Sequence, residues 1–215
     1  MNDLILRSQE VLKNHPVNLK RIEAGKDPGN SIWMWSPGYK PSMKTYNELY
    51  NKSGAIISAV DLLYGIGAYA GFKAIHVEGS TGLYNTNYEG KAKAAVEALK
   101  EVDFVYLHIE ASDEAGHEGN FELKTKTIEY LDQRVVKYIV DETAKMNEQV
   151  AIAILPDHPT PCSIKTHTHE PVPFMIYHPD ESADEVMEYN EFSVEKGYYG
   201  TLKGNEFIKA LFRIT

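Results

Sequence analysis

Two apolar runs of strand length end directly in carboxylates and imidazoles, and this pattern constrains the fold more than any other feature. The runs cover residues 104–109 and 150–155. A strand fixes the residue at its end more rigidly than a loop does, so groups that follow two neighbouring strands can converge on one point. We expect five side chains to converge in this way: Asp113, His117, Asp157, His158 and His167.

The five side chains offer carboxylate oxygens and imidazole nitrogens. This mixture suits zinc or manganese, whereas magnesium relies more on oxygen ligands. Asp113 and His117 are four residues apart, so on a helical turn they share a face and can both reach one ion. With His167 they could fill one site that keeps an open position, whereas Asp157 and His158 supply only half of a second site.

Roles that involve no metal are alternative interpretations for several of these residues and their neighbours. An aspartate and a histidine four apart occur by chance on many surface helices. His169 competes with His167, because two residues apart on an extended segment point the same way. His108 lies in the middle of a strand and is predicted to be a hydrogen-bonded core residue. Lys124 belongs to the charged face of a predicted helix, which we interpret as solvated surface.

Strands alternate with helices from residue 72 onward, which predicts an α/β fold with a mostly parallel sheet and flanking helices. Residues 1–50 lack this alternation and resemble part of a cap or inserted lid. Pro16 should end a first helix, because the residue before a proline is pushed out of helical geometry. We expect further helices at 53–71, 88–101, 122–146 and 205–212, and strands at 32–35, 72–77, 104–109, 150–155 and 174–177.

Charge and composition narrow the class of protein. The formal net charge of −9 disfavours general attraction to nucleic acid. No apolar run approaches the roughly 20 residues that cross a bilayer, and the N-terminus does not resemble a signal peptide. The single cysteine, Cys162, allows no internal disulfide. We therefore expect a cytoplasmic protein without a membrane partner. An anionic substrate would need local positive charge, which two bound divalent ions would supply.

Six sequence motifs follow one another in one order over nearly the whole chain. They are His15-Pro-Val-Asn18 with Arg21 downstream, Gly54-Ala-Ile-Ile-Ser-Ala-Val-Asp61, Thr86-Asn-Tyr-Glu-Gly-Lys-Ala92, Glu110-Ala-Ser-Asp-Glu-Ala-Gly-His117, Asp157-His-Pro-Thr-Pro161, and His167 followed by Pro171-Val-Pro173. Together they resemble the archaeal-type 2,3-bisphosphoglycerate-independent phosphoglycerate mutases of the alkaline phosphatase superfamily.

The resemblance implies a role for each of the five residues. Asp113, His117 and His167 would bind one divalent metal, manganese, zinc or magnesium, and Asp157 with His158 would bind another. It also selects His167 over His169. In the family, an aspartate near the N-terminus and a serine or threonine complete the second site. That hydroxyl takes the phosphoryl group from one hydroxyl of phosphoglycerate and returns it to the other.

The chain departs from the family in length, since full-length relatives are roughly twice as long. The resemblance implies that residues 1–75 are the C-terminal part of an inserted lid and residues 76–215 the C-terminal, metal-binding part of the phosphatase-like domain. The catalytic nucleophile would then be absent, the chain alone inactive, and its metal content at most about one ion. A smaller departure is Trp33-Met-Trp-Ser-Pro-Gly38, where many relatives are expected to carry an arginine.

Other functions fit the same residues. One is another metal-dependent phosphotransferase or phosphatase of the superfamily, including relatives labelled homoserine kinases. A second is a non-catalytic assembly module with a vestigial site. In each case an exposed sheet edge predicts self-association.

Overall fold

A computed structural model describes residues 1–34 and 38–214, and the chain divides into two units, Met1–Ser42 and Met43–Thr215. The strand expected at 32–35 is not formed at 32–34, while Trp35, Ser36 and Pro37 lie outside the described residues. These three residues also belong to the motif Trp33-Met-Trp-Ser-Pro-Gly38, where many relatives are expected to carry an arginine. The boundary at residue 75 concerns two parts of a longer relative and stays a prediction.

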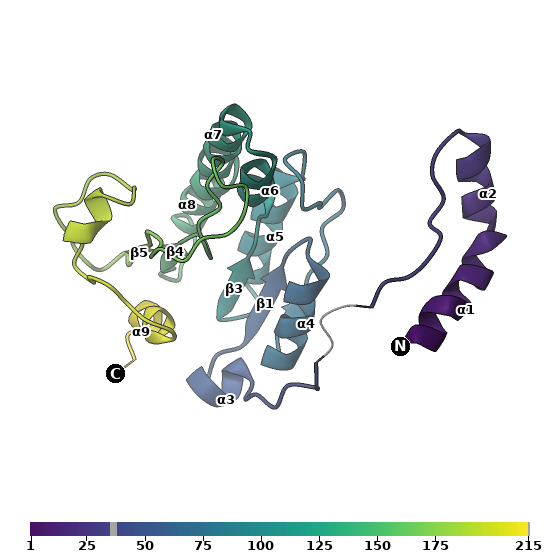
Figure 1. The fold of residues 1–215 in the computed structure, drawn as a ribbon. Coiled ribbons are helices and arrows are strands. Elements are labelled where there is room, and N and C mark those ends of the chain that lie inside the picture. The colour runs from purple at the N-terminus through teal and green to yellow at the C-terminus, as the bar shows by residue number, and fades with distance from the viewer. Residues whose placement is uncertain (35–37, 215) are drawn as a thin grey trace. The chain divides into compact units, whose positions relative to one another are not determined.

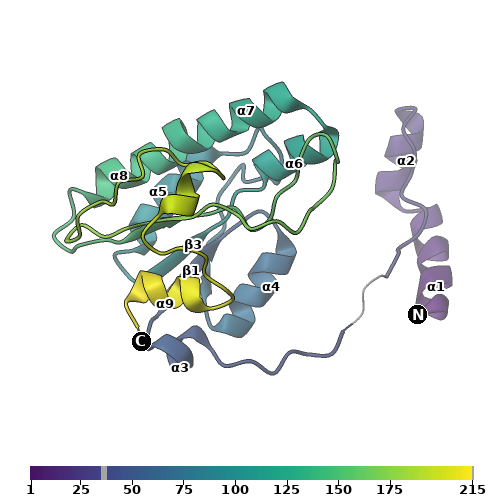
Figure 2. The same cartoon turned by 60° about the vertical axis from the view of Figure 1, so that its left-hand side comes forward.

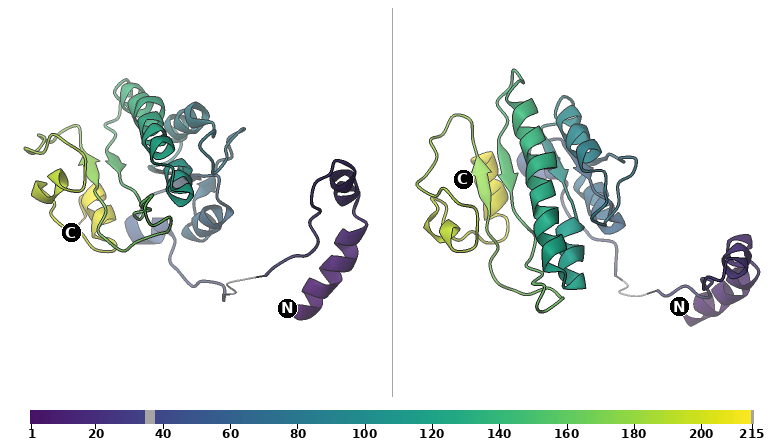
Figure 3. Two further views of the ribbon diagram at one scale, coloured as in Figure 1. Left: turned by 45° about the horizontal axis from the view of Figure 1, so that its top comes forward. Right: turned by 90° about the horizontal axis from the view of Figure 1, so that it is seen from above.

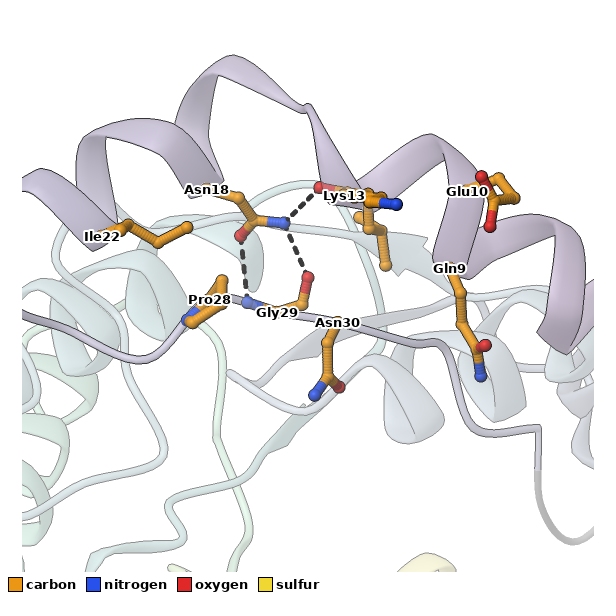
Figure 4. A pocket seen from close by; sticks show the side chains of 9 residues that line it. Gln9, Glu10, Lys13, Asn18, Ile22, Pro28, Gly29 and Asn30 are labelled. Atoms are coloured by element: carbon orange, nitrogen blue, oxygen red, sulfur yellow. Dashed lines mark hydrogen bonds between the residues drawn. The ribbon is translucent and has the colours of Figure 1, made fainter.

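The first unit contains helices α1 (Asn2–Lys13) and α2 (Pro16–Glu23), and the break between them falls at Pro16, as predicted. Asn18 joins them to the following segment (Figure 4). Its amide nitrogen donates to the carbonyls of Leu12 at 2.7 Å and Gly29 at 2.6 Å, and its amide oxygen accepts from the Gly29 N–H at 2.9 Å. These bonds use both N–H groups of the buried amide and give its oxygen a donor.

The second unit is built on a parallel sheet of order β2–β1–β3 (Figure 1). Its strands are β1 (Gly54–Ile57), β2 (Lys73–Ala74) and β3 (Phe104–Leu107), and Ala55 pairs with Lys73 and Val105. The central strand β1 is buried throughout. Helix α4 (Asp61–Ala70) follows β1 and α5 (Tyr88–Ala98) precedes β3. Because the two crossovers run in opposite directions, right-handed connections place α4 and α5 on opposite faces (Figure 2).

Helices α6 (Ala111–Glu118), α7 (Phe121–Tyr130) and α8 (Lys137–Thr143) cover the α5 side of the sheet, and α3 (Tyr46–Tyr50) lies at the amino ends of β2 and β3. Helix α6 leaves β3, and α7, a π-helical segment (Leu131–Val136) and α8 run on from it. The α5 and π-helical residues Tyr88, Ala92 and Val135 form a buried core with Ala111. Helix α3 carries Tyr46, whose ring packs against four aromatic rings: Tyr50, Phe72, Phe104 and Phe212.

The last part of the chain holds a separate antiparallel pair, β4 (Ile152–Ile154) and β5 (Met175–Tyr177). A 3-10 helix (Ser193–Lys196) and α9 (Glu206–Phe212) follow. Figure 3 shows these yellow C-terminal residues beside the green strand pair. Within the described residues, β4 has no hydrogen-bonded neighbour other than β5, and β3 none other than β1. No described helix is long and apolar enough to span a membrane.

Two predicted helices were wrong in part. Residues 54–57, expected inside a helix, form the buried strand β1. A short run of apolar residues fits either a buried parallel strand or a buried helix, so periodicity could not separate the two. The single helix expected at 122–146 is interrupted by the π-helical turn and ends at Thr143. The predicted alternating α/β architecture with a parallel sheet is confirmed.

Candidate metal centre

Three residues separate the end of β3 from helix α6, which presents Asp113 and His117 one turn apart. His117 Nε2 lies 3.2 Å from Asp113 Oδ2. The short connection holds both side chains at the carboxyl end of the sheet, where ligand sites of α/β folds form. The shared helical face that the spacing predicted is therefore present.

His167 reaches the same point from the segment that follows β4. Its Nε2 lies 3.1 Å from His117 Nε2 and 3.5 Å from Asp113 Oδ1. The ligand atoms of this predicted trio all lie within 4.8 Å of one another. Two imidazole nitrogens facing each other beside a carboxylate oxygen are poorly matched unless a cation or a proton sits among them. The donor set therefore fits a divalent transition metal.

The second predicted pair lies against the first trio. His158 Nε2 is 3.4 Å from Asp157 Oδ2, and the His158 ring contacts that of His167 in a tilted arrangement with centroids 3.7 Å apart. His158 Nδ1 is 3.9 Å from Asp113 Oδ1. Asp113, His117, His158 and His167 thus lie in one cluster, which Asp157 joins through its contact with His158. The described chain has two three-ligand groups, Asp113 with His117 and His167, and Glu110 with Asp113 and Glu114; His169 is exposed and belongs to neither.

Two further residues contact the cluster, and sequence reasoning missed both. The carbonyl of Lys165 lies 3.0 Å from His117 Nδ1. The hydroxyl of Thr160 donates to Asp113 Oδ1 and lies 3.2 Å from His158 Nδ1. The sequence signal that could have indicated Thr160 is its position between two prolines, two residues after His158 and inside the motif Asp157-His-Pro-Thr-Pro161.

Lys124 is a correction to the expected solvated helix face. It is partly buried, and its ammonium donates to the carbonyl of Thr160 at 2.6 Å. The neighbouring charged residues of that face, Lys126 and Glu129, do point to solvent, with side chains 52% and 47% exposed. A residue at the edge of a charged face could not be separated from the rest of it by spacing alone.

Behind the cluster lies a partly buried polar layer. His108 Nδ1 is 3.3 Å from the hydroxyl of Ser58, and its Nε2 is 3.4 Å from Glu110 Oε2, so the predicted hydrogen bond is present. The expected place in the middle of a strand is wrong, because His108 follows the end of β3 and is only partly buried. Burial lowers the pKa of His108. Burial, and then the nearby carboxylate of Asp113, raises the pKa of Glu110. Burial also lowers the pKa of Lys91 to about 8. In each of these three groups burial favours the uncharged form.

Known proteins resemble the chain over nearly its whole length. The metalloenzyme superfamily pattern matches residues 6–210. The 2,3-bisphosphoglycerate-independent phosphoglycerate mutase of Methanosarcina acetivorans is 54% identical over 212 residues, which are 98% of this chain and 53% of that protein. A probable enzyme of the same name from Geobacter sulfurreducens is 50% identical over 192 residues, covering 89% of this chain and 48% of that protein.

Solved structures agree with the sequence matches. The PH0037 protein from Pyrococcus horikoshii superposes with a TM-score of 0.85 at 36% identity, covering 97% of this chain and 55% of that one. The cofactor-independent phosphoglycerate mutase from Thermoplasma acidophilum gives a TM-score of 0.55 at 27% identity, over 92% and 46% respectively. The chain spans about half the length of these relatives, and its matched residues place it in the metalloenzyme superfamily, alongside the cofactor-independent phosphoglycerate mutases.

Proposed function

We propose that the chain is the C-terminal, metal-binding part of a cofactor-independent phosphoglycerate mutase that interconverts 2- and 3-phosphoglycerate. The observation that carries this proposal is the convergence of Asp113, His117 and His167 within 4.8 Å, in a chain that is 54% identical to half of an enzyme of that name. This reaction would be a step of glycolysis and gluconeogenesis and would take place in the cytoplasm.

In this proposal Asp113, His117 and His167 hold one divalent ion, and Asp157 with His158 contribute to a second. Manganese, zinc and magnesium are the candidates, and the two histidines of the trio favour the first two. Bound ions would supply positive charge that stabilises phosphate oxygens and the attacking and leaving oxygens of phosphoryl transfer. Lys165 and Thr160 would orient two of the metal-binding side chains, His117 and Asp113.

We further propose that the other half of the relatives carries the second-site aspartate and the serine or threonine nucleophile. This chain alone should then bind about one ion and lack mutase activity. Titration calorimetry with Mn²⁺ should give about one site, and Asp113→Asn should remove it, whereas Asp132→Asn, on an exposed helix face, should not. A mutase turnover by this chain comparable with that of a full-length relative would contradict the proposal.

Substrate class needs a separate experiment, because another phosphotransferase or phosphatase would use the same metal residues. Mutase and general phosphatase assays should be compared on a full-length protein that contains this sequence. Phosphate release without interconversion of phosphoglycerates would favour the phosphatase. A complete absence of metal binding and of both activities would favour a non-catalytic assembly module.

Self-association is the remaining proposal. The all-apolar strand β3 is the kind of strand that parallel sheets bury on both sides. Here Tyr106 is 37% exposed, and Leu155, directly after β4, is 44% exposed. Open strand edges with exposed apolar residues favour association with another chain. Light scattering should show a mass that grows with concentration, and a constant monomer mass would contradict this.

A further inference from the structure

The hydroxyl of Thr160 contacts one residue of each predicted metal site. Its side chain comes from the segment after β4 and is almost completely buried, with 3% of the residue exposed. The hydroxyl donates to Asp113 Oδ1 and lies 3.2 Å from His158 Nδ1. Asp113 belongs to the first predicted site and His158 to the second.

Hydrogen-bond chemistry fixes the direction of both contacts. An ionised carboxylate only accepts, so the single hydroxyl hydrogen of Thr160 goes to Asp113. The hydroxyl must then accept from His158, which places the ring hydrogen of His158 on Nδ1. The lone pair is then left on Nε2, which lies 3.4 Å from Asp157 Oδ2. Both atoms are acceptors, so the pair is matched when a cation lies between them. Which ring nitrogen is free to bind a metal is set by the hydrogen bond that the other one makes.

The backbone around Thr160 is held from outside the cluster. The ammonium of Lys124 donates to the Thr160 carbonyl at 2.6 Å. Pro159 has a fixed φ, and Pro161 restricts Thr160 to extended geometry. A Cβ at Gly116 would lie 2.4 Å from the same carbonyl oxygen, so α6 and this segment are in close contact. The backbone that carries the hydroxyl is therefore held in place.

We infer that Thr160 is a positioning residue that links the two predicted metal sites. It orients the Asp113 carboxylate of the first site and holds His158 of the second in the tautomer whose Nε2 carries no hydrogen. The inference rests on the proposed metal function for its consequence. Its structural content, the tautomer of His158, can be measured without any metal. We expect the metal affinity to fall about 10–100-fold when the hydroxyl is removed, which is the range found for residues that orient metal ligands.

The test compares three variants of the chain. Thr160→Val keeps the shape and removes the hydroxyl, whereas Thr160→Ser keeps the hydroxyl and removes a methyl group. Thr143→Val is the matched control, because Thr143 is also buried, 7% exposed, but its hydroxyl bonds only to carbonyls of its own helix. Nitrogen-15 NMR of the histidine rings, at a pH where imidazole is neutral, reports the tautomer of His158 in the metal-free chain. Calorimetry with Mn²⁺ then reports affinity.

We expect the unmodified chain, Thr160→Ser and Thr143→Val to show the Nδ1–H tautomer at His158 and similar Mn²⁺ affinities. Thr160→Val should lose that tautomer and bind Mn²⁺ 10 to 100 times more weakly, with an unchanged melting temperature in chelator. An Nε2–H tautomer in the unmodified chain overturns the inference even if Thr160→Val does not fold. Equal affinity losses in the serine and valine variants overturn it too, because packing would then be the cause. If the unmodified chain has the expected tautomer but binds no ion, the metal proposal fails and the positioning of His158 stands.

Discussion

Replacing Gly116 with alanine should displace the segment that carries Asp157 and His158. A Cβ at this position would lie 2.4 Å from the carbonyl oxygen of Thr160 and 3.0 Å from its Cγ2. The nearest atom belongs to the backbone, so a change of side-chain rotamer cannot relieve the contact. Helix α6 and the Thr160 segment must move apart.

The geometry gives the size of the effect. Ordinary contact begins at 3.4 Å, so the two elements must separate by about 1 Å (3.4 minus 2.4). Overpacking of this kind costs about 1–3 kcal/mol. Alanine in place of glycine inside a helix returns up to about 1 kcal/mol. We therefore expect a net destabilisation of roughly 0–2 kcal/mol, and Mn²⁺ affinity at least about tenfold weaker, because the shift also moves the hydroxyl that orients the Asp113 carboxylate.

Gly65 provides the control, since it also lies inside a helix but a Cβ there would meet nothing within 4 Å. Gly65→Ala should be neutral or stabilised by up to about 1 kcal/mol, with unchanged metal affinity. Urea unfolding followed by far-UV circular dichroism in chelator gives the stabilities, and calorimetry gives the affinities. If Gly116→Ala matches Gly65→Ala in both measurements, the close approach of α6 to Thr160 is not what positions the site.

Three further predictions test the charges. Asp113→Asn should weaken Mn²⁺ binding by more than about 100-fold, beyond the loss expected for an orienting residue, and an affinity within threefold of the unmodified chain, by calorimetry, would contradict its ligand role. Burial lowers the pKa of Lys91 from 10.5 to about 8, so the unfolded chain holds more protons between these values and stability should rise with pH across them. Lys91→Met should remove that rise, of about 2 kcal/mol after allowance for screening, in urea midpoints measured against pH. The Arg213 guanidinium lowers the pKa of Asp180 from 3.8 to about 2 through bonds of 2.9 and 2.6 Å, so this stabilisation is present above 3.8 and is lost as the pH falls to about 2. Arg213→Gln should therefore move acid unfolding, followed by circular dichroism, to higher pH, and an unchanged midpoint would contradict the pairing.

Much of the fold could be predicted because its signals are local. Helix α1 ends before Pro16 as expected, and β3 leads into a helix that carries Asp113 and His117 one turn apart. The strand β1 could not be predicted, because four buried apolar residues fit a helix equally well until their neighbours in the sheet are known. The π-helical turn at Leu131–Val136 likewise has no pattern of its own in the sequence.

The identity of the five clustered side chains was readable from the sequence, because carboxylates and imidazoles at strand ends need partners wherever the chain places them. What the sequence could not supply was the set of contacts between segments far apart in it. Thr160 and Asp113 are separated by 47 positions, and Lys124 and Thr160 by 36. A threonine hydroxyl and a lysine ammonium are ordinary surface groups in any local pattern. Only the packing of α6 and α7 against the segment after β4 buries them beside the cluster, and burial is what makes their hydrogen bonds directional enough to orient Asp113 and His158.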